Sequence, residues 1–494
     1  MNYDSIIIGG GISGMTAALL LAKHGQKVAL LERSSQLAPM VRGFSRDGLY
    51  FDTGFHYAGG LGDGEVLDRF FQHLGLADKF VKQPYAENGF DLFRTQDAIP
   101  DFAFPCGYAR TEAHFTERFP QERQAIQNYL EALRTECRRL PYLNLELSLD
   151  EQQLMGVLQG PSVQQVLDGL GVTPPLRQLL TLHALLYGVP PEQMPFTLHA
   201  SVVAPYIEST YGIEGGGRQL VRAYSERLAE LGVAVFCRTT VSRIELGSSG
   251  QVTAVQTEKG ERFTCTRCIA SVAPRVLLEL VPEKAFRPAY RKRLANLNET
   301  PSAHLLFAAC ENDSLLEKRN LFLDGNGVPF TDLSKTPLAK RTLYLARAHA
   351  EPGTTPRHGL IIICPADQAE TAEWQKSRRG QRPADYVAFK QQTMDALTRR
   401  VSDTCPELGT LTPLAGSTPL TMADYAGNPG GGIYGVKHMV GQYNPQPATR
   451  IKGLMLAGQG TAAPGILGAA LSAYLCCGHL LGHDTLRNEV KQCS

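Results

Sequence analysis

The stretch "DSIIIGGGISGMTAALLLAKHGQKVALLER", residues 4–33, opens with a short apolar run that leads directly into a cluster of glycines. Residues 5–8 are apolar and β-branched enough to predict a buried parallel strand. The next six residues, 9–14, fit the pattern G-x-G-x-x-G. A helix over about 12–24 should follow and end at Gly25, and a second strand over 27–31 ends at Glu32. This order of elements predicts a dinucleotide-binding unit.

Each residue of the glycine turn has its own expected role. Gly9 permits the tight turn, Gly11 lets the backbone approach a diphosphate, and Gly14 lets the helix pack close to the strand. Free N–H groups at the helix start, including those of Ile12 and Ser13, should point at the phosphates. Glu32 lies about 20 residues beyond the turn, where an acid accepts hydrogen bonds from a ribose and disfavours a 2′-phosphate.

A second unit of similar form lies at the far end of the chain. Residues 453–482, "GLMLAGQGTAAPGILGAALSAYLCCGHLLG", read as a strand, a glycine turn and a helix. The first pattern alone does not choose between FAD and NAD, but one ligand held by both ends of a long chain is typical of FAD enzymes. The positive end of the last helix could then stabilise negative charge on a reduced flavin.

Composition sets the broad class of the protein. The chain has 494 residues, of which 43% are hydrophobic and 20% charged, with a net charge of +1, so no strong field attracts nucleic acid. Eleven cysteines at scattered spacings suggest no disulfide framework. With no basic region before the first apolar run, we expect a cytoplasmic protein. Residues 465–482 are apolar but glycine-rich, and we interpret them as a helix buried in protein, leaving peripheral contact with a membrane open.

Four segments then carry a family resemblance: "FDTGFHYAGG" (51–60), "YGVPPEQMPFTLHA" (187–200), "GGIYG" (431–435) and "GLMLAGQ" (453–459). They resemble the superfamily of phytoene desaturases, carotenoid isomerases and all-trans-retinol 13,14-reductases (retinol saturases). The resemblance implies an α/β fold, a Rossmann-type FAD-binding domain of the glutathione reductase kind with an interleaved α+β substrate domain. The FAD-binding domain would combine 1–90, 205–275 and 440–494, and the substrate domain 91–204 and 276–439.

The resemblance also extends the set of expected FAD contacts beyond the first turn. Val241 should meet the adenine through its backbone, Gly54 should pass the flavin, and Gln459 should hydrogen-bond the ring system or the diphosphate. One departure stands out, because Ala38-Pro39 occupy the place where family members carry Gly-Gly. The further expected contacts are Arg33, Arg42, Gly43, Gly458, Gly465, Ile466, Leu467 and Gly468.

The chemistry expected of such a site is hydride transfer between a flavin and a carbon of an apolar substrate. The sequence contains no Ser-His-Asp grouping by motif and no metal-ligand cluster. His56, Tyr57 and Tyr434 are the candidate proton donors or substrate contacts. We expect an FAD-dependent oxidoreductase acting on a C=C bond of a hydrophobic polyene or isoprenoid, with retinol saturase-like reduction favoured; the electron donor or acceptor is not specified.

Three alternatives stay open at this stage. A carotenoid desaturase or isomerase of the same superfamily would need the same pocket. A lipid-binding protein of the GDP-dissociation-inhibitor type shares the fold without redox chemistry, although Glu32 and the intact glycine turn argue against it. A flavin amine oxidase would typically place an aromatic cage near the flavin, and the C-terminal motif contains none.

Overall fold

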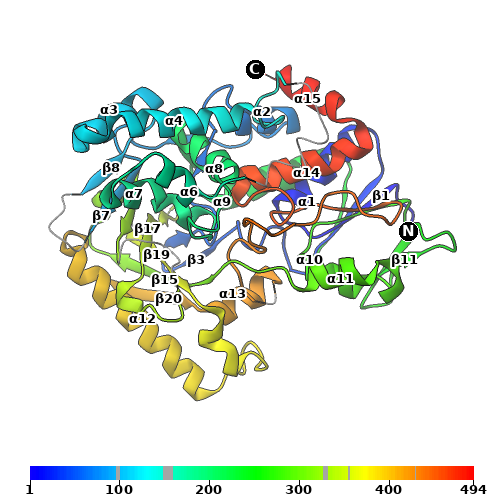
Figure 1. The fold of residues 1–494 in the computed structure, drawn as a ribbon. Coiled ribbons are helices and arrows are strands. Elements are labelled where there is room, and N and C mark those ends of the chain that lie inside the picture. The colour runs from blue at the N-terminus through cyan, green and yellow to red at the C-terminus, as the bar shows by residue number, and fades with distance from the viewer. Residues whose placement is uncertain (96–100, 148–159, 326–331, 354–356, 429, 494) are drawn as a thin grey trace.

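A computed structural model describes residues 1–95, 101–147, 160–325, 332–353, 357–428 and 430–493. Two sheets organise these residues (Figure 1), one near each end of the molecule. Each sheet packs against its own set of helices, and the two sets form separate apolar clusters.

The first sheet is parallel and contains the strand that the opening stretch predicts. Its strand order is β10–β2–β1–β14–β21, and every neighbouring pair runs parallel. Both β1 and β2 are buried along their whole length, as near-continuous apolar runs in a parallel sheet should be. The strands are β1 (Ser5–Ile8), β2 (Val28–Leu31), β10 (Ala234–Phe236), β14 (Arg267–Ala270) and β21 (Leu454–Leu456).

Helices from both ends of the chain cover one face of this sheet. Helix α1 (Ile12–Lys23) follows β1, and α14 (Gly465–Leu481) follows β21 and lies beside α1 (Figure 1). The two helices are joined by a hydrogen bond of 2.7 Å from the Ser13 hydroxyl to the Ala469 carbonyl. Their core continues into α2 (Val66–Leu74), α9 (Gly217–Glu230) and α15 (His483–Lys491).

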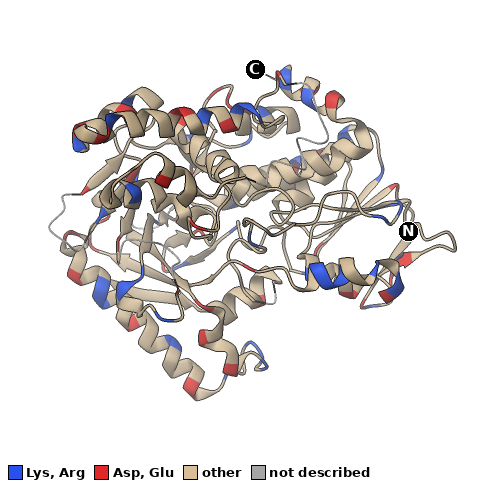
Figure 2. Ribbon diagram, in the orientation of Figure 1, with Lys and Arg blue, Asp and Glu red and all other residues tan. Residues whose placement is uncertain are grey.

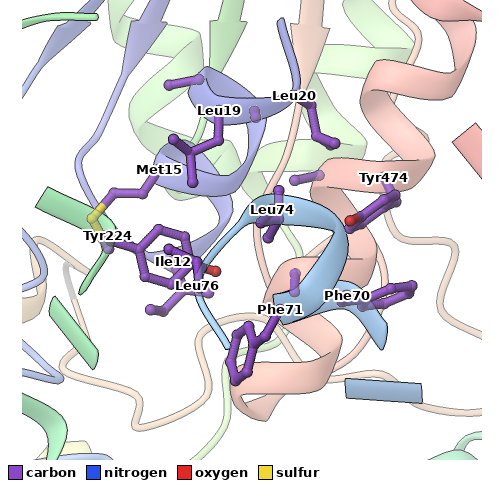
Figure 3. Packing of buried hydrophobic residues seen from close by; sticks show 14 of the residues in the cluster. Ile12, Met15, Leu19, Leu20, Phe70, Phe71, Leu74, Leu76, Tyr224 and Tyr474 are labelled. Atoms are coloured by element: carbon purple, nitrogen blue, oxygen red, sulfur yellow. The ribbon is translucent and has the colours of Figure 1, made fainter. Parts of the chain in front are cut away.

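Figure 3 shows how tightly this core is packed. Leu20 of α1 lies on the side of Leu74 of α2 and Tyr474 of α14, and Met15 points toward Tyr224 of α9. The Phe70 and Tyr474 rings stack with centroids 4.3 Å apart. Because both ends of the chain contribute side chains to one core, folding alone brings the two ends together without a ligand.

The second sheet is mixed and has seven strands in the order β20–β15–β19–β17–β16–β7–β8. Only β7 and β16 pair in parallel; the other pairs are antiparallel. Helix α12 (Ala384–Thr404) packs on one face. The strands are β7 (Asp91–Arg94), β8 (Phe102–Phe104), β15 (Ser302–Cys310), β16 (Asn320–Leu323), β17 (Leu343–Arg347), β19 (His358–Ala366) and β20 (Thr412–Ser417).

The opposite face of this sheet is covered by helices from the middle of the chain. They share one apolar cluster with Phe322 and Tyr344 of the sheet. These helices are α3 (Tyr108–Arg118), α4 (Arg123–Arg138), α6 (Val163–Gly169), α7 (Pro174–Thr181) and α8 (Phe196–Glu208).

The described residues also form three small sheets and three more α-helices. The small sheets are β18–β4–β3, β5–β9–β6 and β11–β12–β13. Their strands are β3 (Phe44–Arg46), β4 (Leu49–Phe51), β5 (Ala58–Gly59), β6 (Lys82–Pro84), β9 (Thr210–Ile213), β11 (Val241–Leu246), β12 (Val252–Thr257), β13 (Arg262–Thr264) and β18 (His349–Ala350). The helices are α10 (Pro274–Leu280), α11 (Pro288–Ala295) and α13 (Pro419–Ala426).

The division into an FAD-binding domain and a substrate domain, which the family resemblance implies, stays a prediction together with its boundaries. The first sheet takes its strands from residues 5–31, 234–270 and 454–456. The second takes its strands from residues 91–104 and 302–417. The chain therefore passes between the two sheets more than once, as an interleaved arrangement requires.

Helix α14 is the apolar helix that the sequence places inside the protein. Its residues Ala473, Tyr474 and Cys476 are fully buried against α1 and α2. Among the residues that the structure describes, none of the helices combines the length and apolar character needed to traverse a lipid bilayer. Figure 2 shows Lys and Arg interspersed with Asp and Glu along outer helices such as α4 and α12.

Buried histidines give the fold a predictable response to acid. His199 lies between two tyrosines, with the Tyr129 hydroxyl 2.8 Å from Nε2 and the Tyr187 hydroxyl 2.9 Å from Nδ1. Burial lowers its pKa from 6.5 to about 3 and lowers the pKa of His73 and of His438 to about 4. The unfolded chain therefore binds protons below pH 6.5 that the folded protein does not bind.

We predict that stability falls as the pH drops from 7.5 to 5, by about 2 kcal/mol for each of these three histidines. Thermal unfolding across that pH range measures the effect. Replacing His199 by Gln should reduce the loss of stability over this pH range by about 2 kcal/mol, since one of the histidines with a lowered pKa is removed. The same change at the exposed His479 is the control and should leave the slope as it is. An equal slope in both variants would show that His199 does not resist protonation.

Candidate functional site

A cavity of about 710 Å³ lies where the two sheets meet. Its lining includes the β1–α1 turn, the end of β2 and the start of α14 from the first half of the molecule. The second half contributes residues of α8, β17 and β19. One continuous space therefore joins the glycine turn to the apolar core of the other sheet.

The start of α1 offers an exposed set of backbone donors to this cavity. The first helical hydrogen bond runs from the Met15 N–H to the Gly11 carbonyl, so the N–H groups of residues 12–14 have no acceptor within the helix. Gly11 caps the helix without a side chain, and a Cβ atom built there would meet no protein atom within 4 Å. The space beside this helix end is therefore free for an anionic group.

The start of α14 presents the same arrangement from the other end of the chain. Residues 465–468 line the cavity, and Pro464 caps the helix without a side-chain hydrogen bond. Added Cβ atoms at Gly458 and Gly465 would also meet nothing within 4 Å. Two helix N-termini thus face one cavity, which gives it two regions of positive partial charge.

Glu32 is held firmly at the end of β2. Its side chain is buried and accepts hydrogen bonds of 2.7 Å from the backbone N–H groups of Gly10 and Ser34. Each carboxylate oxygen has a further lone pair for a ligand hydroxyl. The ribose-binding role expected of Glu32 stays a prediction, and the two backbone hydrogen bonds hold its carboxylate on the cavity wall.

The departure at Ala38-Pro39 has a visible structural consequence. Ala38 adopts φ 44°, a left-handed conformation that favours glycine, although it is buried and donates its N–H to the Gly10 carbonyl at 2.9 Å. Ala38, Pro39 and Met40 all line the cavity. Ala38 therefore has a backbone conformation that glycine adopts more readily, although it carries a side chain.

Arg42 and Gly43, which follow this segment, do not line the cavity. The Arg42 guanidinium donates to the Gln36 side chain, and Gly43 has φ 62° beside the carbonyl of Phe51. The tight packing against β4 explains the glycine without a cofactor. Contact between these two residues and a cofactor stays a prediction that the cavity does not favour.

Asp52 is a buried acid that sequence reasoning left without a role. Its carboxylate accepts hydrogen bonds from the Gly217 N–H at 2.7 Å, from the Tyr50 hydroxyl at 3.2 Å and from His349 Nε2 at 3.1 Å. Asp52 therefore fixes the start of α9 next to the segment that carries Gly54 and His56. The "FDTG" motif combines this structural acid with a glycine on the cavity wall.

The far part of the cavity is bounded by what we call the apolar wall. These residues line the cavity and also belong to, or pack against, the apolar cluster of the second sheet. They are Tyr57, Leu185, Leu186, Val202, Tyr206, Tyr344, Ile363 and Ala463. Ala463 lies just before α14, so the wall adjoins the helix end described above.

A buried acid lies behind this wall. Asp91 is fully buried and its Oδ2 accepts hydrogen bonds of 2.9 Å from the Tyr57 hydroxyl and from His183 Nε2. Asn320 donates to Oδ1 at 2.9 Å. These bonds compensate the burial of the carboxylate and hold the Tyr57 ring against the cavity.

The three catalytic candidates all line the cavity, but they differ in whether their polar atoms already form hydrogen bonds within the protein. The hydroxyls of Tyr57 and Tyr434 donate to Asp91 and to the Leu185 carbonyl, each at 2.9 Å. His56 Nε2 is buried without a hydrogen-bond partner among the described residues. Burial lowers the pKa of His56 to about 4, so its imidazole is neutral at pH 7.

The cavity gathers most of the predicted cofactor contacts from five separate parts of the chain. Gly14 does not line it, because its role is helix packing: an added Cβ would overlap the Gly9 carbonyl. The predicted contacts that line the cavity are Gly9, Gly11, Ile12, Ser13, Glu32, Arg33, Gly54, Val241, Gly458, Gln459, Gly465, Ile466, Leu467 and Gly468.

Sequence reasoning missed Asp91 and Tyr344. Asp91 opens a strand and Tyr344 lies within one, and neither belongs to a motif. Alternation along β17 could have placed Tyr344 on the same face as Ala346, but not beside His56. Within the described ranges, no group of three or more His, Cys, Asp or Glu side chains forms a metal-binding arrangement.

The amino-acid sequence is similar to one known family and to several named enzymes. The sequence profile of the family "Flavin containing amine oxidoreductase" matches residues 12–481. The all-trans-retinol 13,14-reductase of Rattus norvegicus is 26% identical over 97% of this chain and 86% of its own. The hydroxyneurosporene desaturase of Rubrivivax gelatinosus is 24% identical over 98% of this chain and 94% of its own.

Solved structures show the same fold. The crystal structure of an oxidoreductase from Methanosarcina mazei superimposes with a TM-score of 0.66 at 15% identity. The match covers 96% of this chain and 99% of that one. The α/β architecture with its mixed second sheet is therefore that of known oxidoreductases, which confirms the expected fold class.

Alanine substitutions at Gly11 and at Gly14 should distinguish an effect on ligand binding from an effect on folding. Replacing Gly11 by Ala places a methyl group in open space at an ordinary φ of −76°, so stability should change by about 1 kcal/mol or less. The methyl group would, however, occupy the approach of a diphosphate, and affinity for a flavin nucleotide should fall at least tenfold.

Gly14→Ala is the matched variant with the opposite expectation. Its methyl group overlaps the Gly9 carbonyl, so the protein should lose about 3 kcal/mol of stability. Thermal unfolding of flavin-free protein and flavin titration measure the two effects. Full flavin affinity in the Gly11 variant would contradict a diphosphate at this turn.

Proposed function

The chain belongs to the family of flavin-containing amine oxidoreductases, and from this premise we propose that it binds FAD and reduces a C=C bond of a hydrophobic polyene. The observation that carries the proposal is the single cavity that joins two helix N-termini to the apolar wall. A flavin-dependent enzyme that acts on a polyene needs both parts, since FAD carries charge and a polyene does not.

The residues of the turn and of β2 fit FAD in particular. The N–H groups at the start of α1 can donate hydrogen bonds to a diphosphate. The two carboxylate oxygens of Glu32, fixed by the N–H groups of Gly10 and Ser34, can accept hydrogen bonds from ribose hydroxyls. Val241 lies at the first residue of β11 on the cavity wall, where it suits contact with an adenine. The α14 helix end would lie at the flavin ring, where its positive partial charge favours the reduced form.

When bound, the flavin would supply the hydride that adds to one carbon of the C=C bond. The proton that adds to the other carbon would come from solvent, since the hydroxyls of Tyr57 and Tyr434 are engaged within the protein and His56 is neutral. The chain's own residues position the substrate and keep bulk water out. The apolar wall removes water from a polyene, and Asp91 fixes the Tyr57 ring in that wall. Burial raises the pKa of Tyr57 and of Tyr434, so both phenols keep their protons at neutral pH.

The three candidate residues are better suited to substrate contact than to rapid proton transfer. The hydroxyls of Tyr57 and Tyr434 are already engaged within the protein. Neutral His56, with its lowered pKa, is a weak base. We therefore assign His56, Tyr57 and Tyr434 to the substrate-facing surface.

Among the named relatives, the retinol 13,14-reductases favour saturation and the hydroxyneurosporene desaturase favours the reverse reaction. Both reactions need the same cavity, so the desaturase is the second candidate. An amine substrate, which the family name suggests, is the third and is tested alongside them.

We predict that the purified protein is yellow, with a flavin absorbance band. Anaerobic incubation of the reduced enzyme with retinoids, carotenoids and other isoprenoids should give a product heavier by about two mass units. A product lighter by two under oxidising conditions would indicate a desaturase, and an unchanged mass with altered retention an isomerase. Peroxide formation with a primary amine would indicate an amine oxidase. A colourless protein that cannot take up FAD would contradict the proposal and favour a lipid-binding role.

A further inference from the structure

The turn between β21 and α14 contains one peptide group that the other residues of the turn do not hold. Residues 458–461 form a β-turn, closed by a hydrogen bond of 3.0 Å from the Thr461 N–H to the Gly458 carbonyl. The Thr461 hydroxyl donates to the same carbonyl at 2.8 Å. These bonds fix the two ends of the turn and leave its central peptide, between Gln459 and Gly460, without a hydrogen bond inside the turn.

The central peptide of a β-turn has two common orientations. Types I and II differ by a half rotation of that peptide, and type II needs a φ of about +80° at the third residue of the turn. That residue is Gly460 here, and a glycine allows both types. Gly460 does not have a positive φ, so the turn holds the type I orientation although its sequence permits the other.

His438 supplies the contact that selects this orientation. Its Nε2 lies 2.6 Å from the Gln459 carbonyl, and because a carbonyl oxygen can only accept, Nε2 carries the proton and donates. His438 is 5% exposed and does not line the cavity, whereas Gln459 and Gly460 do. The peptide is trans, so its N–H and C=O point in opposite directions, and the Gly460 N–H points away from His438. That N–H has no acceptor among the described residues.

A chain of hydrogen bonds sets the tautomer of His438. Burial lowers its pKa to about 4, so the ring is neutral at pH 7 and carries one proton. The Asn444 amide donates to Nδ1 at 3.1 Å, which leaves that proton on Nε2. Asn444 is held in turn by Gln442, whose Nε2 donates to Asn444 Oδ1 at 3.0 Å, and the Asn298 N–H donates to Gln442 Oε1 at 2.9 Å. Each donor in this chain therefore points toward the turn.

We propose that His438, oriented by Asn444, is a positioning residue that holds the central peptide of the 458–461 turn so that the Gly460 N–H faces the bound cofactor. The inference rests on the proposed function, because the acceptor of that N–H is an atom of FAD. Without the His438 donor the Gln459 carbonyl would lose its hydrogen bond, and rotation of the peptide would relieve that cost. The rotated turn would present a carbonyl oxygen to a cofactor that carries negative charge.

The test combines His438→Phe, which keeps an aromatic ring but removes the donor, with Gly460→Ala in a double-mutant cycle. Alanine resists the positive φ of the rotated turn. A Cβ atom at residue 460 would meet Val436 at 3.7 Å and Pro274 at 3.8 Å, which are ordinary contacts. FAD titration of flavin-free protein gives the four dissociation constants. His438→Phe should weaken FAD binding at least tenfold when residue 460 is glycine, and by about threefold or less when it is alanine.

Three further variants separate positioning from packing. Asn444→Leu leaves His438 in place but frees its tautomer, so FAD binding should weaken about threefold or more, and Gly460→Ala should again cancel the loss. His438→Gln, whose amide can still donate to the Gln459 carbonyl, should keep FAD affinity within about threefold of wild type. His199→Leu is the matched control, because it removes a buried histidine with two hydrogen bonds that does not line the cavity. It should lower the unfolding temperature and leave FAD affinity unchanged.

The possible outcomes separate this inference from the proposed function. Full FAD affinity in His438→Phe, or an equal loss with glycine and with alanine at residue 460, would reject the positioning role and leave the proposed function standing. If His438→Phe does not fold, the same comparison with Asn444→Leu decides. Failure of the wild-type protein to bind FAD would reject the proposed function, and the positioning role with it.

Discussion

The packing of α1 against α14 is the contact on which the rest of the structure depends. The Ser13 hydroxyl binds the Ala469 carbonyl, and the two helices share a core with α2 and α9. Both helices follow strands of one parallel sheet, so both begin at the same edge of that sheet. Two helix N-termini therefore face one cavity from opposite ends of the sequence. Neither end could form this site alone.

The second sheet supplies the apolar part of the same cavity. Its covered face provides aromatic and aliphatic side chains, while α12 seals the opposite face. Asp91 places a carboxylate behind the wall and satisfies it with Tyr57, His183 and Asn320. The protein thus keeps charge out of the far part of the cavity while fixing the rings that line it. A charged nucleotide and an apolar substrate could then share one space.

Much of this arrangement was predictable from local sequence. The strand, glycine turn, helix and Glu32 follow each other within about 30 residues, and the structure has them in that order. Helix α14 was predicted as buried because glycines interrupt its apolar run, and it packs in the core. Family resemblance pointed to Gly54 and Val241, which line the cavity, and to Arg42 and Gly43, which do not.

The far wall was not predictable, for a physical reason. Asp91 and Tyr344 belong to two strands that are separated in sequence and come together only through sheet pairing, and of the two only Tyr344 lines the cavity. Strand alternation gives the face of a residue, but not its neighbours across other elements. The same holds for Ala38, whose left-handed backbone is invisible in the sequence although the departure from Gly-Gly marked the place. Sequence motifs therefore predicted the part of the cavity beside the glycine turn, whereas the apolar wall became visible only in the folded structure.

The most direct measurement of the central claim is hydrogen exchange of the protein stripped of flavin and then reloaded with FAD. The account predicts simultaneous protection of backbone amides in two distant segments, residues 11–14 and 465–468, with no change in α12. Protection at only one of the two segments, or at neither, would contradict a single cofactor site built by both ends of the chain.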